Sequence, residues 1–423
     1  MAAPVTEFRY PCDNCGAALV FRPGQDSLIC PYCGHEQKIG PGAARAPGLQ
    51  PDPQDPDRPA LQWDSIHKNP GLQEIPLDRG LRIDRESDLT ESVRTLSCPN
   101  CGAKIEQGDA QHALLCPFCA TPVVTDTGAT RQIKPQGVLP FVVTQDQARD
   151  SLDRWLGSLW FAPNGLSQYA RRQRQMAGIY SPYWTFDADT QTAYSGSRGD
   201  DYFETVYVTV NVNGRMQQQA QQVVRTRWTP VSGRVARRFD DVLVIAATSL
   251  PRSYTDALAP WDLSHLNDYD PRYLAGFQAE GYTVPLADGH RLARSEMAKV
   301  IANDIRRDIG GDRQQISGAD TQHRDETFKH VLLPIWSAAY KYNGKSYRFV
   351  VNGQTGRVQG ERPYSIWKIA FAILLALIAA AVFMYFADES GLISISDSGG
   401  ASSYSRGAGP VYDSGGGYVI RGY

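Results

Sequence analysis

Residues 98–119 read CPNCGAKIEQGDAQHALLCPFC, and residues 12–33 read CDNCGAALVFRPGQDSLICPYC. Each stretch contains two Cys-x-x-Cys pairs with 14 residues between them (16 to 29 and 102 to 115), and the second stretch follows the first at an offset of 98 − 12 = 86 residues. Together the two stretches contain all 8 cysteines of the 423-residue chain. The cysteines are Cys12, Cys15, Cys30, Cys33, Cys98, Cys101, Cys116 and Cys119.

Paired Cys-x-x-Cys turns are typical of structural zinc sites, because two tight turns bring four thiolates to one tetrahedral ion. The sequence therefore predicts two zinc ribbons, with two structural Zn²⁺ ions per chain. An even cysteine count also fits a disulfide framework, and a single Cys-x-x-Cys pair also fits a redox site. The matched pairs favour zinc over both, and the first residues, MAAPVTEFRY, lack the apolar segment of a secretory signal.

Length and composition indicate a globular chain of roughly two to four domains. Its net charge is 43 − 45 = −2, so no overall electrostatic field attracts the chain to nucleic acid or anionic lipid. Local composition divides the chain into seven segments. These are zinc ribbon 1 (1–40), a Pro-rich linker (41–60), a connecting segment without assigned structure (61–95), zinc ribbon 2 (96–125), an α+β domain (134–362), a transmembrane helix (367–387) and a disordered tail rich in Gly, Ser and Tyr (388–423).

The α+β domain is predicted from two kinds of periodicity. Thr144 and Gln147 form a capping box before an apolar stripe of helical spacing, and a second such stripe predicts a helix over 287–309. Between them the stretches 179–187, 201–211, 217–228 and 241–249 are rich in Val, Tyr, Thr and Trp, as strands are. Asn213-Gly214 and Asn343-Gly344 mark hairpin turns. The predicted fold class is α+β multidomain, with two zinc ribbons, a domain built on an antiparallel sheet and one C-terminal transmembrane helix.

The segment from Ile369 to Ala387 contains 19 residues without a charge. At about 1.5 Å per residue it nearly spans the ~30 Å hydrocarbon core of a bilayer. Positive charges precede it, acidic residues follow it, and the next positive charge is Arg406. By the positive-inside rule we expect a single pass with the large N-terminal part in the cytoplasm and the tail outside.

A search for catalytic motifs finds none. Gly344-Lys345-Ser346 resembles the end of a P-loop, but Ala339 stands where the loop needs a glycine. We therefore expect no enzymatic activity. Weaker candidates for ligand binding are His35 beside ribbon 1, the carboxylate pairs Asp187/Asp189 and Asp200/Asp201, and two basic clusters; turn positions and solvated faces explain them equally well. The basic clusters are Arg171, Arg172 and Arg174, and Arg234, Arg237 and Arg238.

The combination of motifs resembles one bacterial family. Beside the ribbons it includes LPFVVTQDQARDSLDRWLGSLWFAPNGL (139–166), GIYSPYWTFDADT (178–190) and LLPIWSAAYKYNGKSYRFVVNGQTGRVQGERP (332–363). The family consists of membrane-anchored double zinc-ribbon proteins of the TFIIB-type or CPxCG kind, typically encoded beside flotillin-like SPFH proteins and PspA-like phage-shock proteins. Such chains are sometimes labelled as primosomal protein N′ or helicase-like because of their ribbons, but this chain lacks the nucleotide-binding P-loop.

The resemblance implies an adaptor in the bacterial cytoplasmic membrane. Such a scaffold recruits cytoplasmic protein partners, of the SPFH or PspA kind, to the membrane, with envelope stress as its setting. The bilayer is the second expected partner, through 369–387. The alternative is a zinc-ribbon protein that binds nucleic acid in replication, at the primosome, or in transcription, without helicase activity of its own.

Overall fold

The computed structural model describes residues 10–39, 72, 74–82, 89–106, 114–119, 121–123, 126–160, 176–212, 215–342, 345–361 and 365–389. The predicted linker at 41–60, most of the connecting segment and nearly all of the predicted tail lie outside these residues. The chain divides into two compact units, Met1–Pro363 and Tyr364–Tyr423, and each is described by itself.

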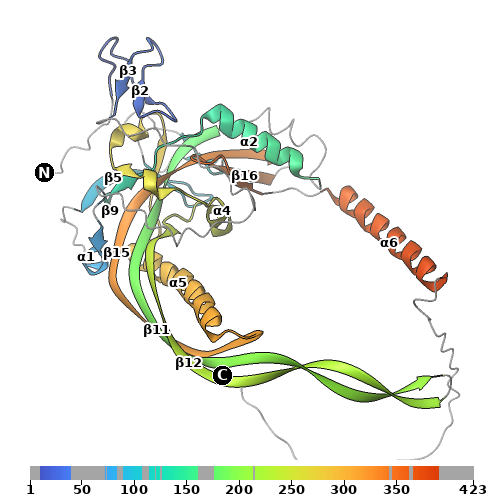
Figure 1. Ribbon diagram of the computed structural model, residues 1–423. Coiled ribbons are helices and arrows are strands. Elements are labelled where there is room, and N and C mark those ends of the chain that lie inside the picture. Colours follow the sequence, from blue (N-terminus) through green and yellow to red (C-terminus); the bar gives the residue numbers. More distant parts are fainter. Residues whose placement is uncertain are drawn as a thin grey trace, which may run out of the picture. The chain divides into compact units, whose positions relative to one another are not determined.

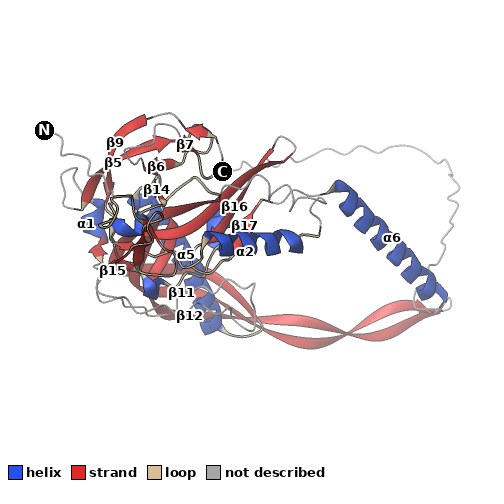
Figure 2. Cartoon of the chain, turned by 90° about the horizontal axis from the view of Figure 1, so that it is seen from above, coloured by secondary structure: helices blue, strands red, loops and turns tan. Residues whose placement is uncertain are grey.

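Three long strands form the centre of the first unit (Figures 1 and 2). They are β11 (Met176–Val212, 37 residues), β12 (Arg215–Ile245, 31 residues) and β15 (Arg313–Tyr342, 30 residues). The four predicted stretches all begin in β11 or β12, but the strands also run through the Gly- and Ser-rich residues between them. Gly196 is needed there, because a Cβ atom at this position would lie 2.4 Å from the Gln315 carbonyl oxygen.

The sheet around these strands is mixed, which corrects the predicted antiparallel sheet. Most pairs are antiparallel, but β10 (Gly137–Val138) is parallel to β15, and β14 (Gln278–Gly281) is parallel to β11. The parallel pairing of β14 with β11 is possible because β12 ends at Ile245, opposite Tyr183. This leaves the edge of β11 at Ile179 and Tyr180 open, and the chain returns there as β14 after a crossover.

Short strands complete the 12-stranded sheet, whose path is β13-β10-β15-β11-β14-β6-β5-β9. They are β4 (Ile75–Pro76), β5 (Thr90–Ser97), β6 (Lys104–Glu106), β9 (Asp126–Ile133), β13 (Asn267–Asp268), β16 (Lys345–Asn352) and β17 (Val358–Gly360). Two small sheets lie outside this path: β1 (Val20–Phe21), β2 (Ser27–Ile29) and β3 (Glu36–Lys38), and the pair β7 (Leu114–Leu115) and β8 (Pro122–Val123).

Helices are few in the described part of this unit. They are α1 (Leu77–Leu81), α2 (Gln145–Ser158), α4 (Arg252–Ala257) and α5 (Leu286–Ile309), with 3-10 turns η2 (Leu263–His265) and η3 (Pro271–Leu274). The predicted capping box is confirmed at α2: the Thr144 hydroxyl accepts from the Gln147 N–H at 3.3 Å, and the Gln147 side chain accepts from the Thr144 N–H at 2.9 Å. The helix predicted over 287–309 is α5.

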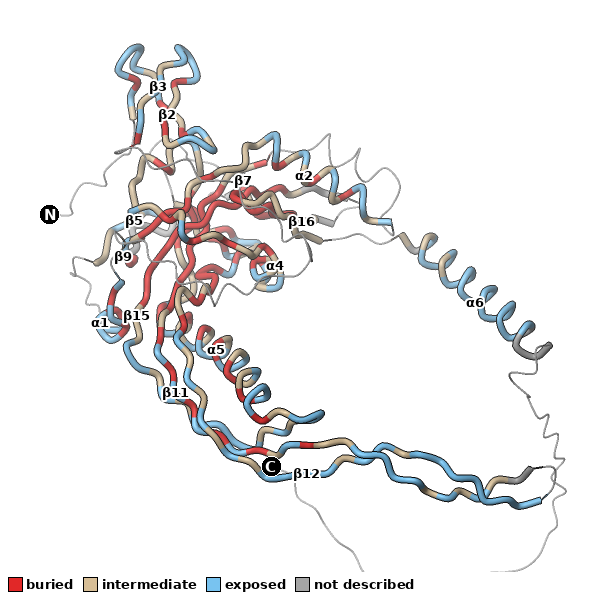
Figure 3. Tube along the Cα trace, viewed as in Figure 1, coloured by how far each residue is buried: buried red, intermediate tan, exposed pale blue. Residues whose placement is uncertain are grey.

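Helix α5 packs against the three long strands and closes one core of the unit (Figure 3). Its buried stripe includes Met297, Ile301 and Ile305. Gly289 lets the helix approach the sheet, since a Cβ atom there would lie 2.5 Å from the Trp184 ring. At its other end the Arg237 guanidinium of β12 donates two hydrogen bonds to Asp304, at 2.6 and 2.8 Å. Packing and this ion pair together fix the helix on the sheet.

The second unit contains α6 (Ile366–Glu389). Its window Trp367–Met384 has a mean hydropathy of 2.4, so this helix is long and apolar enough to cross a membrane. Within its unit the apolar side chains from Phe371 to Phe383 are exposed, as those of a lipid-facing helix are. The structure thus contains one candidate membrane span where the sequence predicts it.

We predict that Met297→Ala destabilises the first unit by about 2–5 kcal/mol, because it leaves a cavity between α5 and the strands. Thermal and urea unfolding of the full chain measure this. The matched control is Arg291→Ala on the exposed side of the same helix, which we expect to change stability by less than about 0.5 kcal/mol. Equal losses in the two variants would contradict the packing of α5 through this face.

Candidate metal centres

The four Cys-x-x-Cys loops close in the same way. In each, the backbone N–H of the first cysteine donates to the carbonyl oxygen five residues later. The pairs are Cys12 to Ala17 (2.7 Å), Cys30 to His35 (2.9 Å), Cys98 to Ala103 (2.9 Å) and Cys116 to Thr121 (2.8 Å). This shared closure turns both sulfurs of a loop to one side, which is the geometry that a metal knuckle needs.

Three of the four loops also end on a glycine in the left-handed region. Gly16, Gly34 and Gly102 each have φ of +74°, and each donates its N–H to the carbonyl of the first cysteine in its loop. A residue with a Cβ atom adopts this conformation only at a cost, so glycine is the expected residue. The fourth loop continues with Ala120 in the sequence.

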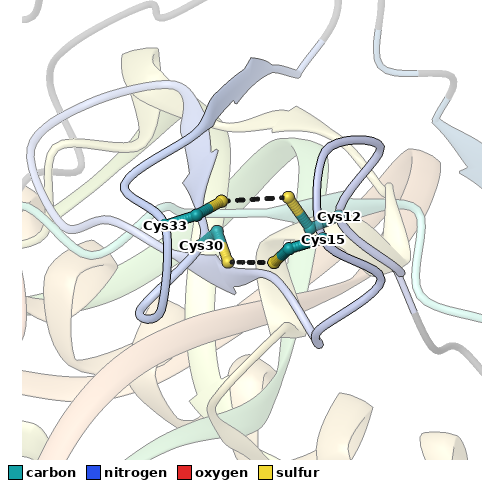
Figure 4. A group of neighbouring side chains, drawn as sticks. All are labelled: Cys12, Cys15, Cys30 and Cys33. Atoms are coloured by element: carbon teal, nitrogen blue, oxygen red, sulfur yellow. Dashed lines mark hydrogen bonds between the residues drawn. The ribbon is translucent and has the colours of Figure 1, made fainter.

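The first group of sulfurs lies between two loops of ribbon 1 (Figure 4). The Sγ atoms of Cys12 and Cys33 are 3.6 Å apart, and those of Cys15 and Cys30 are 3.4 Å apart. A tetrahedral ion with metal–sulfur bonds of about 2.3 Å places its sulfurs roughly 3.8 Å from one another. All four sulfurs lie within 4.8 Å of one another, so the group can hold one metal ion.

The second group repeats this geometry. The sulfurs of Cys98 and Cys119 are 3.5 Å apart, and so are those of Cys101 and Cys116. All eight cysteines are free thiols rather than disulfides. The structure therefore brings together the eight predicted ligands in the two predicted sets of four, and soft thiolates in this arrangement suit zinc above harder cations.

The electrostatics of both groups favour the thiolate form at some of the sulfurs: the pKa values of Cys30 and Cys33 are lowered in the first group, and that of Cys101 in the second. The backbone N–H of His35 is the main reason that the pKa of Cys33 is lowered to about 6. In the second group the hydrogen bond between the Cys101 and Cys116 sulfurs lowers the pKa of Cys101 to about 5 and raises that of Cys116. A thiolate present before binding attracts a cation, and the ion then displaces the remaining protons.

Ribbon 1 is packed against the central part of its unit. The N–H of Phe21 in β1 donates to the Ala275 carbonyl, and the Gly24 N–H donates to the Phe141 carbonyl, both at 2.8 Å. The Phe21 ring lies edge-on to Tyr273 and Phe277, with centroids 5.3 and 6.2 Å away. One face of this ribbon is therefore covered, while Cys15, Cys33 and the Tyr32 side chain remain exposed.

Ribbon 2 is built into the sheet itself. Its strand β6 pairs with β14, where Ile105 lies opposite Glu280, and β14 pairs in turn with β11. The Phe118 ring between Cys116 and Cys119 is fully buried, and the Ser337 hydroxyl of β15 donates to the Pro117 carbonyl at 2.8 Å. Three of its four ligands are buried, so this centre belongs to the core of the unit rather than to its surface.

A buried carboxyl group lies at the junction of ribbon 2 and the sheet. The Glu280 side chain is almost fully buried, with the Ser181 hydroxyl 3.4 Å from one of its oxygens, and its other oxygen has no hydrogen-bond partner among the described residues. Burial raises the pKa of Glu280 to about 8. The carboxyl is therefore largely neutral at pH 7, which avoids an unpaired charge in the core.

The weaker candidates of the sequence are not needed to complete the metal centres. The first group is complete without His35, whose carbonyl closes a loop. Asp201 accepts a hydrogen bond from Thr226 and pairs with Arg313, and Arg237 pairs with Asp304. The cluster of Arg171, Arg172 and Arg174 lies outside the described residues.

One charged cluster contains a single residue that the sequence singles out, Asp187, and brings it together with partners that the sequence does not indicate. The Lys329 ammonium is 2.8 Å from the Asp241 carboxylate and 3.5 Å from those of Asp187 and Glu74, and its side chain is only 6% exposed. The Glu74, Asp187 and Asp240 oxygens have a spacing that fits a metal ion, but Lys329 already provides a cation there. A register shift at Phe186/Ala188 brings these carboxylates together, and such bulges are not readable from one sequence.

No protein-family model matches the chain, and no solved structure matches it either. The chain is similar to the uncharacterized protein YdjG of Bacillus subtilis (strain 168), with 24% identity over 241 residues. The alignment covers 56% of this chain and 66% of the relative, which is just under two thirds of its length. The relative's name states no activity, so the family expected from the motifs stays a prediction.

We predict about two metal ions per chain, from four thiolates per closed site, and the loss of one of them in Cys98→Ser. Elemental analysis of the purified full chain measures the ratio. Ser97→Ala serves as the matched control, because it changes the neighbouring residue and keeps all four sulfurs. Disulfides in freshly prepared protein, or a full metal complement in Cys98→Ser, would be incompatible with this centre.

A second prediction concerns pH. The folded pKa of Glu280, about 8, lies above its unfolded value, so the wild type loses stability as pH rises from about 4.5 to 8, at up to ~1.4 kcal/mol per unit. Glu280→Gln removes this loss and is the more stable form at pH 8.5, with the difference shrinking toward pH 4.5. Urea unfolding across this range tests it, with Asp320→Asn at an exposed carboxylate as control; parallel curves for all three proteins would refute it.

Proposed function

We propose that this chain is a zinc-binding adaptor, tethered to the membrane by α6, that recruits cytoplasmic protein partners. The observation that carries the proposal is the presence of two complete four-thiolate groups and one candidate membrane span in the same chain. Four protein ligands saturate a tetrahedral ion and leave no position for water or substrate. The sites are therefore structural, and the proposal includes no catalytic step.

Zinc is the proposed ion in both centres. Cysteine thiolates in a tetrahedral set favour zinc or iron–sulfur chemistry, and duplicated Cys-x-x-Cys knuckles are typical of zinc ribbons. Cys12, Cys15, Cys30 and Cys33 would hold one ion, and Cys98, Cys101, Cys116 and Cys119 the other. When bound, each ion would link two loops that have little core of their own and stabilise them by on the order of 10 kcal/mol.

The proposed location is the bacterial cytoplasmic membrane, with the first unit in the cytoplasm. Support comes from the positive charges before the uncharged stretch Ile369–Ala387 and the acidic residues directly after it. Free thiols agree with this side of the membrane, since the cytoplasm keeps cysteines reduced. The motif resemblance adds the expected partners, proteins of the SPFH or PspA kind, and an envelope-stress setting.

Ribbon 1 is the part of the adaptor that best fits a docking role. Ribbon 2 contributes to the core, whereas ribbon 1 exposes Cys15, Cys33 and the Tyr32 side chain, which is 83% exposed. Binding nucleic acid is the less favoured alternative, because phosphate binding needs free cations and Arg22 of this ribbon is paired with Glu36 at 2.9 Å.

The test is affinity capture from detergent-solubilised bacterial membranes after crosslinking, with the full chain as bait. We expect wild type to retain a cytoplasmic protein that Tyr32→Ala and Cys15→Ser both lose, because both change the exposed face of ribbon 1. Arg291→Ala, on the exposed side of α5, should retain it. An identical set of captured proteins for all four baits would eliminate ribbon 1 as the docking module.

A further inference from the structure

The hairpin of β11 and β12 extends far beyond the sheet that supports it. Pairing between β15 and β11 ends at Gly199, opposite Arg313, whereas β11 and β12 remain paired as far as Val212 and Arg215. The arm is defined here as residues 200–212 and 215–227. Within the described part of the chain its two strands pair only with each other, and Figure 1 shows them leaving the sheet as a twisted ribbon.

One face of the arm carries large exposed apolar side chains. Phe203, Tyr207 and Met216 are 73%, 70% and 74% exposed. They lie on the same face, since Phe203 is opposite Val224 and Met216 is opposite Asn211. An isolated two-stranded ribbon of this kind is only marginally stable in water, so a partner that adds strands would stabilise it.

The edges of the arm differ sharply between its base and its end. At the base, β12 carries Arg225 and Arg227, and β11 carries Asp200 and Asp201, charged residues that disfavour pairing of this part with another molecule. From Thr205 to Val224 the sequence TVYVTVNVNGRMQQQAQQVV holds one charge, Arg215, and no proline. The unprotected end of β11, rich in Val, Thr and Tyr, is therefore suited to pairing with a further strand.

A lipid bilayer does not suit these edges. Unpaired backbone N–H and C=O groups are too costly in hydrocarbon, and the arm has two such edges. The free edge of β11 is also limited in length: the Asp312 carboxylate accepts from the Asp201 N–H at 2.8 Å, and the strand ends at Val212. A pairing strand must therefore fit between these two points.

We propose that the arm binds the arm of a second copy of this chain, through antiparallel pairing of the two β11 edges. The free edge is centred near Val208, so a two-fold axis there places Val208 opposite its own copy and Val206 opposite Val210. In this register the valines of one strand lie opposite valines of the other on one face of the sheet. On the other face Tyr207 of each strand lies opposite Thr209 of its partner. The two hairpins form one four-stranded sheet, in which both central edges are satisfied.

Charge also fits this arrangement. In the two-fold register Glu204 of one copy lies opposite Val212 of the other, and Arg215 is the cross-strand neighbour of Val212. Glu204, which is ion-paired with Arg225 of its own hairpin, therefore shares one row and one face with the second copy's Arg215, two strands or about 10 Å away and within reach of a long side chain. Arg215 approaches Glu204 from the side opposite Arg225, and the two Arg215 side chains lie at opposite ends of the interface.

The test uses the full chain in detergent micelles. Two forms of the chain, each with a different affinity tag, are mixed, and capture through one tag is tested for recovery of the other. Light scattering measures the mass of the protein in each micelle. We expect wild type to contain at least two chains, and Val208→Lys and Val208→Glu each to weaken association at least about tenfold, because each places like charges directly opposite one another. Mixing the two variants should restore capture between their tags, since Lys then faces Glu. This rescue would identify position 208 as the contact between copies.

Gln219→Lys is the matched control. Gln219 lies opposite Val208 on β12, so this variant adds the same charge to the same row but on the outer edge. We expect it to associate as wild type does, and far-UV circular dichroism should show all four proteins folded. A single chain in wild type, association unchanged in both Val208 variants, or failure of the mixture to recover would each overturn the proposal.

Discussion

Hydrogen bonding along both edges of β11 is the constraint on which the first unit depends. From Tyr183 to Gly199 this strand pairs with β12 on one side and β15 on the other. Every buried backbone N–H and C=O group needs a partner, and two long neighbours supply them all along this stretch. α5 packs against the strands, β14 occupies the edge where β12 has ended, and ribbon 2 follows β14 into the sheet.

This arrangement gives the two metal centres different surroundings, although their ligand spacing is the same. Ribbon 2 shares the sheet and buries Phe118, so its metal would stabilise the core as well as two loops. Ribbon 1 is attached through Phe21 and keeps one side exposed. In a chain that acts as an adaptor, the first centre would present a surface and the second would help to hold the unit together.

Several elements could be predicted because their signals are local. The Thr144 capping box, the helix near 287–309 and the apolar stretch before Ala387 each depend on residues a few positions apart. The strands were predicted as shorter pieces, since Gly196 and its neighbours resemble turn residues. Pairing on both sides keeps them extended, which is a tertiary effect. The Lys329 cluster could not be predicted, because its members come from four strands or loops and meet only at a bulge.

The sequence by itself determined the eight ligands, their division into two sets and the position of the apolar helix, because spacing and hydropathy are properties of adjacent residues. Only the tertiary structure decided that the sheet is mixed, that ribbon 2 lies within it and that the hairpin arm extends beyond it. These features depend on which part of each β11 edge still has backbone N–H and C=O groups available for pairing. That choice is made by backbone hydrogen bonding between segments that are 278 − 179 = 99 to 338 − 176 = 162 residues apart, which no local pattern records.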